Sequence, residues 1–90
     1  QLTWSPDGNR IAFVGYGAAA PGAGISATLY TALSDGSDLQ NIYASASAVP
    51  FYLSWTPDSA RIGFLEVASG KLTHKLVSWR GGPAMVVDTA

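Results

Sequence analysis

The segment LTWSPDGNRIAFV, residues 2–14, recurs as LSWTPDSARIGFL, residues 53–65, when 51 is added to each residue number. Seven of the thirteen positions are identical, and four more exchange similar side chains (Thr/Ser, Ser/Thr, Ala/Gly and Val/Leu). Self-similarity at a fixed spacing is the sequence signature of a repeat protein. The chain of 90 residues is therefore predicted to hold two copies of one unit, residues 1–46 and 47–90.

The remainders of the two copies match more loosely. TLYTAL (28–33), an Asp-Gly turn and LQNIY (39–43) correspond to HKLVSW (74–79), a Gly-Gly turn and AMVVD (84–88), with an offset of 45 or 46. The smaller offset indicates about five extra residues in the first copy, and the Gly- and Ala-rich segment 17–24 is the candidate insertion. Insertions in repeat proteins are expected in loops, where added length costs little closure entropy.

Each copy is predicted to form four short β-strands. The first strand ends at Trp4 or Trp55, and a Pro-Asp turn follows, because Pro fixes φ and the Asp side chain can bond the local backbone. The remaining strands are predicted over 10–14, 28–33 and 39–43, and over 61–67, 72–79 and 84–88. No long apolar period of 3.6 residues indicates a helix, so the fold class is all-β.

Residues 4–13, Trp-Ser-Pro-Asp-Gly-x-Arg-Ile-Ala-Phe, are followed by a Leu-Tyr strand and an Asp-Gly turn. This pattern resembles the WD-like β-propeller repeat with a Pro-Asp signature, as in the propellers of TolB, tricorn protease and prolyl-oligopeptidase-type peptidases. The resemblance covers nearly the whole chain and implies two four-stranded antiparallel propeller blades, 1–46 and 47–90. The second copy departs from it at Ser59, where Gly is usual, and at 80–82, where Asp-Gly is usual. The blade-defining residues are Trp4, Pro6, Asp7, Arg10 and Phe13, and Trp55, Pro57, Asp58, Arg61 and Phe64.

Two blades cannot cover their own outer faces. The alternating apolar residues predicted to line those faces are Leu2, Trp4, Ile11, Phe13, Leu29, Leu33 and their counterparts in the second copy. Soluble monomers seldom expose such contiguous apolar patches, and repeat folds need about three or more units for a continuous core. We therefore expect the chain either to be part of a larger propeller or to close a ring of about three to five identical chains.

Composition and charge exclude several function classes. There are no cysteines, one histidine and a net charge of −1, which argues against a thiolate zinc site, a nucleic-acid partner and an anionic-membrane partner. Gly22 to Ala27 match G-x-G-x-x-A, but a predicted strand rather than a helix follows, which indicates a loop and no dinucleotide cofactor. Asp35 and Asp38 lack the further oxygen ligands of a calcium loop. No cofactor and no metal are predicted.

Catalytic residues are not predicted either. His74 lies in a predicted strand, and no nucleophile elbow accompanies it. Asp7 and Asp58 are interpreted as turn caps, each expected to pair locally with the arginine three residues on, Arg10 or Arg61.

The sequence thus favours a non-catalytic scaffold or protein-interaction module, with no enzyme activity. The candidate partner-binding residues are the non-repeated aromatics Tyr16, Phe51 and Tyr52, near the strand ends. The alternative is part of the substrate-filtering propeller of a prolyl-oligopeptidase-like serine hydrolase that lacks its catalytic domain. A third interpretation is purely structural, a ring-forming piece with no natural ligand. Gln1 in place of an initiator Met indicates a piece of a longer chain, so localisation is not readable. The resemblance permits a periplasmic or extracytoplasmic setting.

Overall fold

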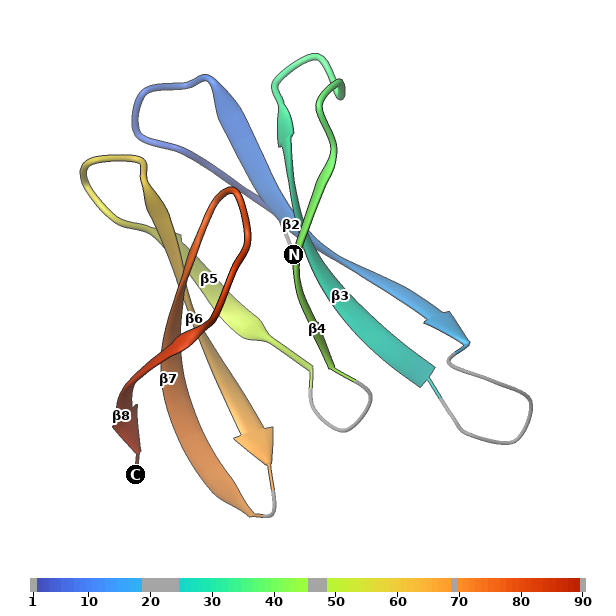
Figure 1. Ribbon diagram of the computed structural model, residues 1–90, viewed down its shortest axis with the longest axis vertical. Helices are drawn as coiled ribbons and strands as arrows, with labels where there is room; N and C mark the ends of the chain where they lie inside the picture. Colours follow the sequence, from blue (N-terminus) through green and yellow to red (C-terminus); the bar gives the residue numbers. More distant parts are fainter. Residues whose placement is uncertain (1, 19–24, 46–48, 69, 90) are drawn as a thin grey trace.

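The computed structural model describes residues 2–18, 25–45, 49–68 and 70–89, and these form strands and turns without a helix. The strands are β1 (Leu2–Trp4), β2 (Arg10–Ala18), β3 (Ile25–Leu33), β4 (Gln40–Ser45), β5 (Phe51–Trp55), β6 (Arg61–Ala68), β7 (Lys71–Ser78) and β8 (Met85–Thr89). They pair antiparallel in chain order, β1 to β4 in sheet 1 and β5 to β8 in sheet 2 (Figure 1). The predicted all-β class with two four-stranded antiparallel sheets is confirmed.

The β2–β3 hairpin is longer than predicted. β2 continues to Ala18 and β3 begins at Ile25, so the ladder extends from the pair Arg10–Leu33 to the pair Ala18–Ile25. The small residues in the extended part of this hairpin made it resemble a loop. One of them, Gly15, leaves room for a neighbouring aromatic ring. The Tyr30 ring lies so close to Gly15 that a Cβ there would stand 2.8 Å from Tyr30 Cε2. In the G-x-G-x-x-A match, residues 25–27 start β3, and residues 22–24 lie outside the described residues.

Equivalent residues pair in the two sheets. Trp4 pairs with Ile11 as Trp55 pairs with Ile62, which is the offset of 51. Arg10 opposite Leu33 corresponds to Arg61 opposite Ser78, with offsets of 51 and 45. The outer hairpins share an irregularity, since the register shifts between Leu29 and Tyr30 in sheet 1 and between His74 and Lys75 in sheet 2.

The Pro-Asp turns have the same hydrogen bonds in both sheets. Asp7 Oδ1 accepts from Ser5 Oγ at 2.5 Å and from the Asn9 amide at 3.0 Å. In sheet 2, Asp58 Oδ1 accepts from Thr56 Oγ1 at 2.5 Å and from the Ala60 amide at 3.0 Å. The hydrogen bonds from Ser5 and from Thr56, followed by those from the backbone amides, lower the pKa of Asp7 and Asp58 below 3.8. Each carboxylate therefore stays ionised and caps its turn at neutral pH.

The two turns differ at one position with a left-handed backbone. Gly8 has φ 76°, and Ser59 occupies the equivalent position with φ 60°, where a residue with a Cβ is strained. The Ser59 hydroxyl accepts a hydrogen bond from the Asp7 amide at 3.2 Å, across the two sheets. A serine at this position thus supplies a contact between the sheets that glycine cannot make.

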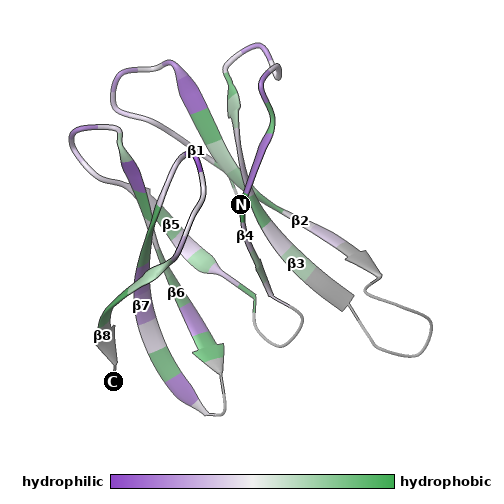
Figure 2. Ribbon diagram, in the orientation of Figure 1, coloured by the Kyte–Doolittle hydropathy of each residue, from purple (hydrophilic) through white to green (hydrophobic). Residues whose placement is uncertain are grey.

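The core lies between the two sheets. Apolar residues recur along the strands of both sheets, whereas the residues near the turns are more polar (Figure 2). The buried cluster contains Ala12, Leu29 and Ile42 from sheet 1 and Leu53, Trp55, Ile62, Phe64 and Val77 from sheet 2. Each sheet therefore uses one face to build the core.

Candidate functional site

The contact between the sheets is asymmetric. Sheet 2 contributes its large side chains, with Ile62 and Phe64 fully buried and Val77 1% exposed. Sheet 1 receives them around Ala12 of β2, beside the buried side chains of Leu29 and Ile42. At the edge, the Trp55 indole nitrogen donates a hydrogen bond to the Thr3 carbonyl of β1 at 3.1 Å. A tryptophan of one sheet thereby bonds the first strand of the other.

A carboxylate, a lysine and a tyrosine form the Glu66 cluster between the sheets. Glu66 of β6 is 3% exposed and accepts from the Tyr43 hydroxyl of β4, with oxygen–oxygen distances of 2.8 Å and 3.0 Å. Lys75 of β7 forms an ion pair with Glu66 and donates to the Tyr43 oxygen at 3.0 Å. Burying a carboxylate is costly unless it is paired and hydrogen-bonded, and both conditions hold here.

Two members of the Glu66 cluster, Tyr43 and Lys75, have raised pKa values. Burial raises the pKa of Tyr43 above its ordinary value of 10.0; Glu66 raises it further, and Lys75 acts against both. The hydrogen bond with Glu66, followed by that with Tyr43, raises the pKa of Lys75 above 10.5. Lys75 is therefore a cation throughout the neutral range, and this geometry suits an ion pair rather than a proton-transfer group.

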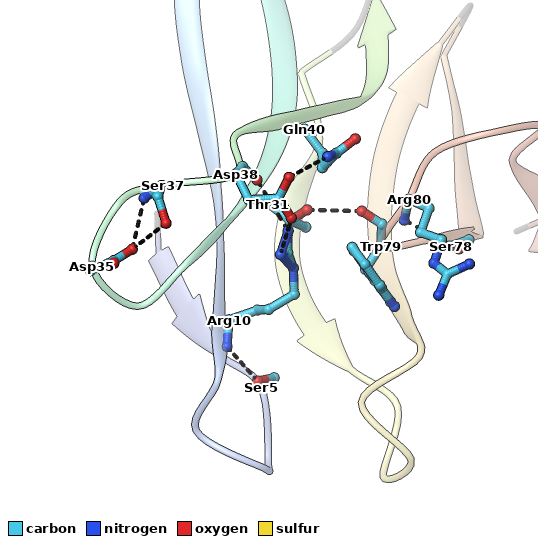
Figure 3. A network of polar contacts seen from close by, with 10 residues as sticks. All are labelled: Ser5, Arg10, Thr31, Asp35, Ser37, Asp38, Gln40, Ser78, Trp79 and Arg80. Carbon is cyan, nitrogen blue, oxygen red and sulfur yellow. Dashed lines mark hydrogen bonds and ion pairs between the residues drawn. The ribbon is translucent and has the colours of Figure 1, made fainter.

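A second polar group, the Arg10 cluster, joins Arg10, Asp38 and Trp79 (Figure 3). The Arg10 side chain is 8% exposed, and its Nη1 and Nη2 lie 3.1 Å and 2.7 Å from Asp38 Oδ2. Its Cζ lies 4.1 Å from the centroid of the Trp79 ring, which follows β7 of sheet 2. The Trp79 carbonyl in turn accepts from Thr31 Oγ1 at 2.8 Å. Arg10 therefore fixes a turn of its own sheet and stacks on the neighbouring one.

The predicted local pair of Asp7 and Arg10 is wrong, because each of these residues has other partners. Asp7 bonds Ser5 and Asn9 within its turn, and Arg10 points away from that turn to Asp38. The cause is the direction of the side chain. Arg10 belongs to the face of β2 that packs on sheet 2, where a buried guanidinium needs a carboxylate and an aromatic ring. The equivalent Arg61 is exposed.

One face of sheet 1 is open. This open face of sheet 1 consists of Leu2, Trp4, Ile11, Phe13 and Tyr30, which the strand registers place on one side. Leu2 and Trp4 are each 55% exposed, and the Phe13 and Tyr30 rings stack with centroids 5.4 Å apart. Trp4 therefore does not pack as Trp55 does, because no sheet covers it. Leu29, predicted on an outer face, instead lies fully buried on the face toward sheet 2.

The opposite end of the stack is also open. The open face of sheet 2 consists of Gly63, Leu65, His74, Leu76 and Val87, by strand register and by equivalence with the core-facing residues of sheet 1. Val87 is 50% exposed. His74 Nε2 and Leu76 Cδ2 would stand 3.2 Å and 3.4 Å from a Cβ at Gly63, so both side chains lie over this glycine.

The predicted partner-binding aromatics lie at one end of the sheets, where β2 and β4 end and β5 begins (Figure 1). Tyr16 is 64% exposed near the end of β2. Tyr52 is 70% exposed with φ 54°, and its ring lies 5.3 Å from that of Phe51. A bulky residue in the left-handed region is strained, and such strain is concentrated at functional sites. Tyr52 is therefore the strongest of the three candidates for ligand contact.

Within the described ranges, no cavity is found, and no group of three or more metal-ligating side chains gathers. The same parts of the chain contain no helix that could cross a membrane. Asp35 accepts from the Ser37 amide at 2.9 Å and the Ser37 hydroxyl at 2.6 Å, while Asp38 holds Arg10. The Asp35 carboxylate therefore stabilises its turn, and the Asp38 carboxylate belongs to the Arg10 cluster.

Comparisons with known proteins give no match: no family model, no curated protein and no solved structure is similar to this chain.

Sequence reasoning missed both polar clusters. Glu66 carried a signal, because it continues the alternation of Ile62 and Phe64 and had to lie on the same buried face. Lys75, opposite Phe64, shares that face. The partner Tyr43 comes from the other sheet, and no spacing in the sequence indicated it.

We expect Arg10→Lys to lower the free energy of unfolding by about 1–2 kcal/mol, because lysine keeps the charge but loses the forked bond and the planar stacking. Arg61→Lys, at the equivalent exposed position, is the matched control, with an expected change within about 0.5 kcal/mol. Urea unfolding followed by tryptophan fluorescence measures both. Equal losses in the two variants would contradict the assignment of Arg10 as a contact between the sheets.

Stability is expected to fall as the pH rises above about 10. The folded-state pKa values of Tyr43 and Lys75 are raised, so their contribution is complete below the unfolded values of 10.0 and 10.5 and is lost as the pH passes the raised values. Tyr43→Phe keeps the ring, which packs on Phe64 with centroids 4.8 Å apart, and removes the hydroxyl. The urea midpoint of this variant should decline less than that of the wild type between about pH 9.5 and 11.5. Parallel curves would refute the assignment.

Proposed function

We propose that the chain is a pair of β-propeller blades of the Pro-Asp, WD-like type and acts as a non-catalytic scaffold for protein interactions. The observation that carries this proposal is the repeated register of the two sheets. Trp4 opposite Ile11 corresponds to Trp55 opposite Ile62, and both outer hairpins shift register at the same place. Four antiparallel strands in chain order are the layout of a propeller blade.

The apolar faces support a stacked architecture. A blade packs one face on the preceding blade and the other on the following blade, so both faces carry apolar side chains. Sheet 1 has Leu29 and Ile42 on its covered side and Leu2, Trp4 and Phe13 on its open side. A sheet with one face in solvent alternates apolar and polar residues along its strands. Sheet 1 instead has apolar residues on both faces.

The buried charged groups support a structural role. Glu66 is bound by Lys75 and Tyr43, and Arg10 is bound by Asp38 and stacks on Trp79. Both clusters join one sheet to the other, so the charges that the fold buries are used to orient sheets. Partner contact is assigned to the strand-end aromatics Tyr16, Phe51 and Tyr52, since exposed aromatic side chains supply large contact area.

Tandem copies test the blade assignment. We expect that, among polypeptides of about three to five copies joined end to end, one length forms a compact, monodisperse particle with a single unfolding transition. Closure covers both open faces, so binding of the dye ANS should disappear at that length. The matched control carries Trp4→Glu in every copy and should keep binding the dye. If every length binds ANS, the blade assignment fails.

A further inference from the structure

The covered interface, which is the contact between sheets 1 and 2, is built from strand positions that recur on the two open faces. Sheet 2 covers sheet 1 with Leu53, Trp55, Ile62 and Phe64. The same strand positions in sheet 1 are Leu2, Trp4, Ile11 and Phe13, which form its open face. The receiving side repeats as well, because Ala12, Val14, Leu29 and Ile42 correspond to Gly63, Leu65, His74 and Val87 on the open face of sheet 2.

Building on the proposed blade pair, we propose that the open face of sheet 1 binds the open face of sheet 2 of a second copy of this chain. The second copy is the occupant because both halves of the interface are present on one molecule, at opposite ends of its stack of two sheets. The two faces differ, so the contact is heterologous and each bound copy presents one further free face. Growth ends when the ring closes.

One hydrogen bond fixes the register of this contact. Within the chain, Trp55 Nε1 donates to the Thr3 carbonyl at 3.1 Å. Thr3 lies opposite Ala12, and Ser54 lies opposite Gly63 at the equivalent position of β5. In the contact between copies, Trp4 Nε1 therefore donates to the Ser54 carbonyl of the second copy. Trp4 is 55% exposed, so the indole is accessible before association.

The open face of sheet 1 lacks the carboxylate and the ammonium group of the Glu66 cluster. The position equivalent to Glu66 is Gly15, and the position equivalent to Lys75 is Tyr30, whose ring lies over that glycine. The Tyr30 ring also stacks on Phe13. Association along this face therefore buries aromatic surface and leaves no carboxylate or ammonium group of sheet 1 without a partner. On the opposing face of sheet 2, Arg61 occupies the position of Arg10.

Two variants, each defective in one face, test the pairing of the faces. Trp4→Glu alters the open face of sheet 1 and Val87→Lys alters that of sheet 2; both side chains are at least 50% exposed, so single chains should fold. Each variant alone has one good face and should remain a monomer. Mixed in equal amounts, they should form a complex of two chains and no larger, because only one interface is intact. Val49→Glu, at a 44% exposed position in the segment between β4 and β5 and outside both faces, is the control and should keep the mass of the wild type.

Trp4→Phe tests the hydrogen bond and should weaken association about tenfold, because the ring remains but the N–H donor is lost. The inference is overturned if the mixed variants form no complex, if either variant alone keeps the wild-type oligomeric mass, or if the wild type is a folded monomer or a polydisperse aggregate. A folded monomer would leave the blade assignment standing if tandem copies close. Failure of the tandem copies would remove the blade assignment itself.

Discussion

A β-sheet has two faces, and this chain covers only one face of each of its two sheets. The covered pair of faces buries Ile62 and Phe64 of sheet 2 completely and Leu29 of sheet 1 with them. Burial of apolar surface is the dominant favourable term in folding, at about 25 cal/mol for each Å². The same kind of surface stays in water at Leu2 and Trp4, each 55% exposed. The fold is therefore an open stack, and the proposed association rests on the surface that it leaves uncovered.

Apolar contact alone does not fix the angle and register at which two sheets meet. Two polar clusters do so here. Arg10 holds Asp38 in its own sheet and stacks on Trp79 of the other, and Glu66 receives Tyr43 from across the interface. A misaligned pair of sheets would leave a buried guanidinium or carboxylate without partners, which costs more than a shifted apolar contact. The clusters thus select one arrangement of the sheets.

The sequence alone predicted the strands, their antiparallel order and the Pro-Asp turns, because alternation and turn chemistry are local. It did not predict which faces are covered. Trp4 and Trp55 stand in nearly identical segments, yet one is 55% exposed and the other 9% exposed, since only the latter meets a neighbouring sheet. Arg10 and Arg61 differ in the same way, as the turn of sheet 2 has Pro83 where sheet 1 has Asp38. The pairing of Arg10 with Asp38 joins β2 to a turn 28 residues further along, and no local pattern encodes it.

The central claim is that the open faces of this chain complete each other. The most direct measurement is the solution mass of the 90-residue chain by light scattering on a sizing column, across a range of protein concentrations. A closed ring predicts a discrete, concentration-independent mass of about three to five times the chain mass of 9.3 kDa. A folded monomer of 9.3 kDa with native sheet content, stable on dilution and on concentration, would contradict the claim.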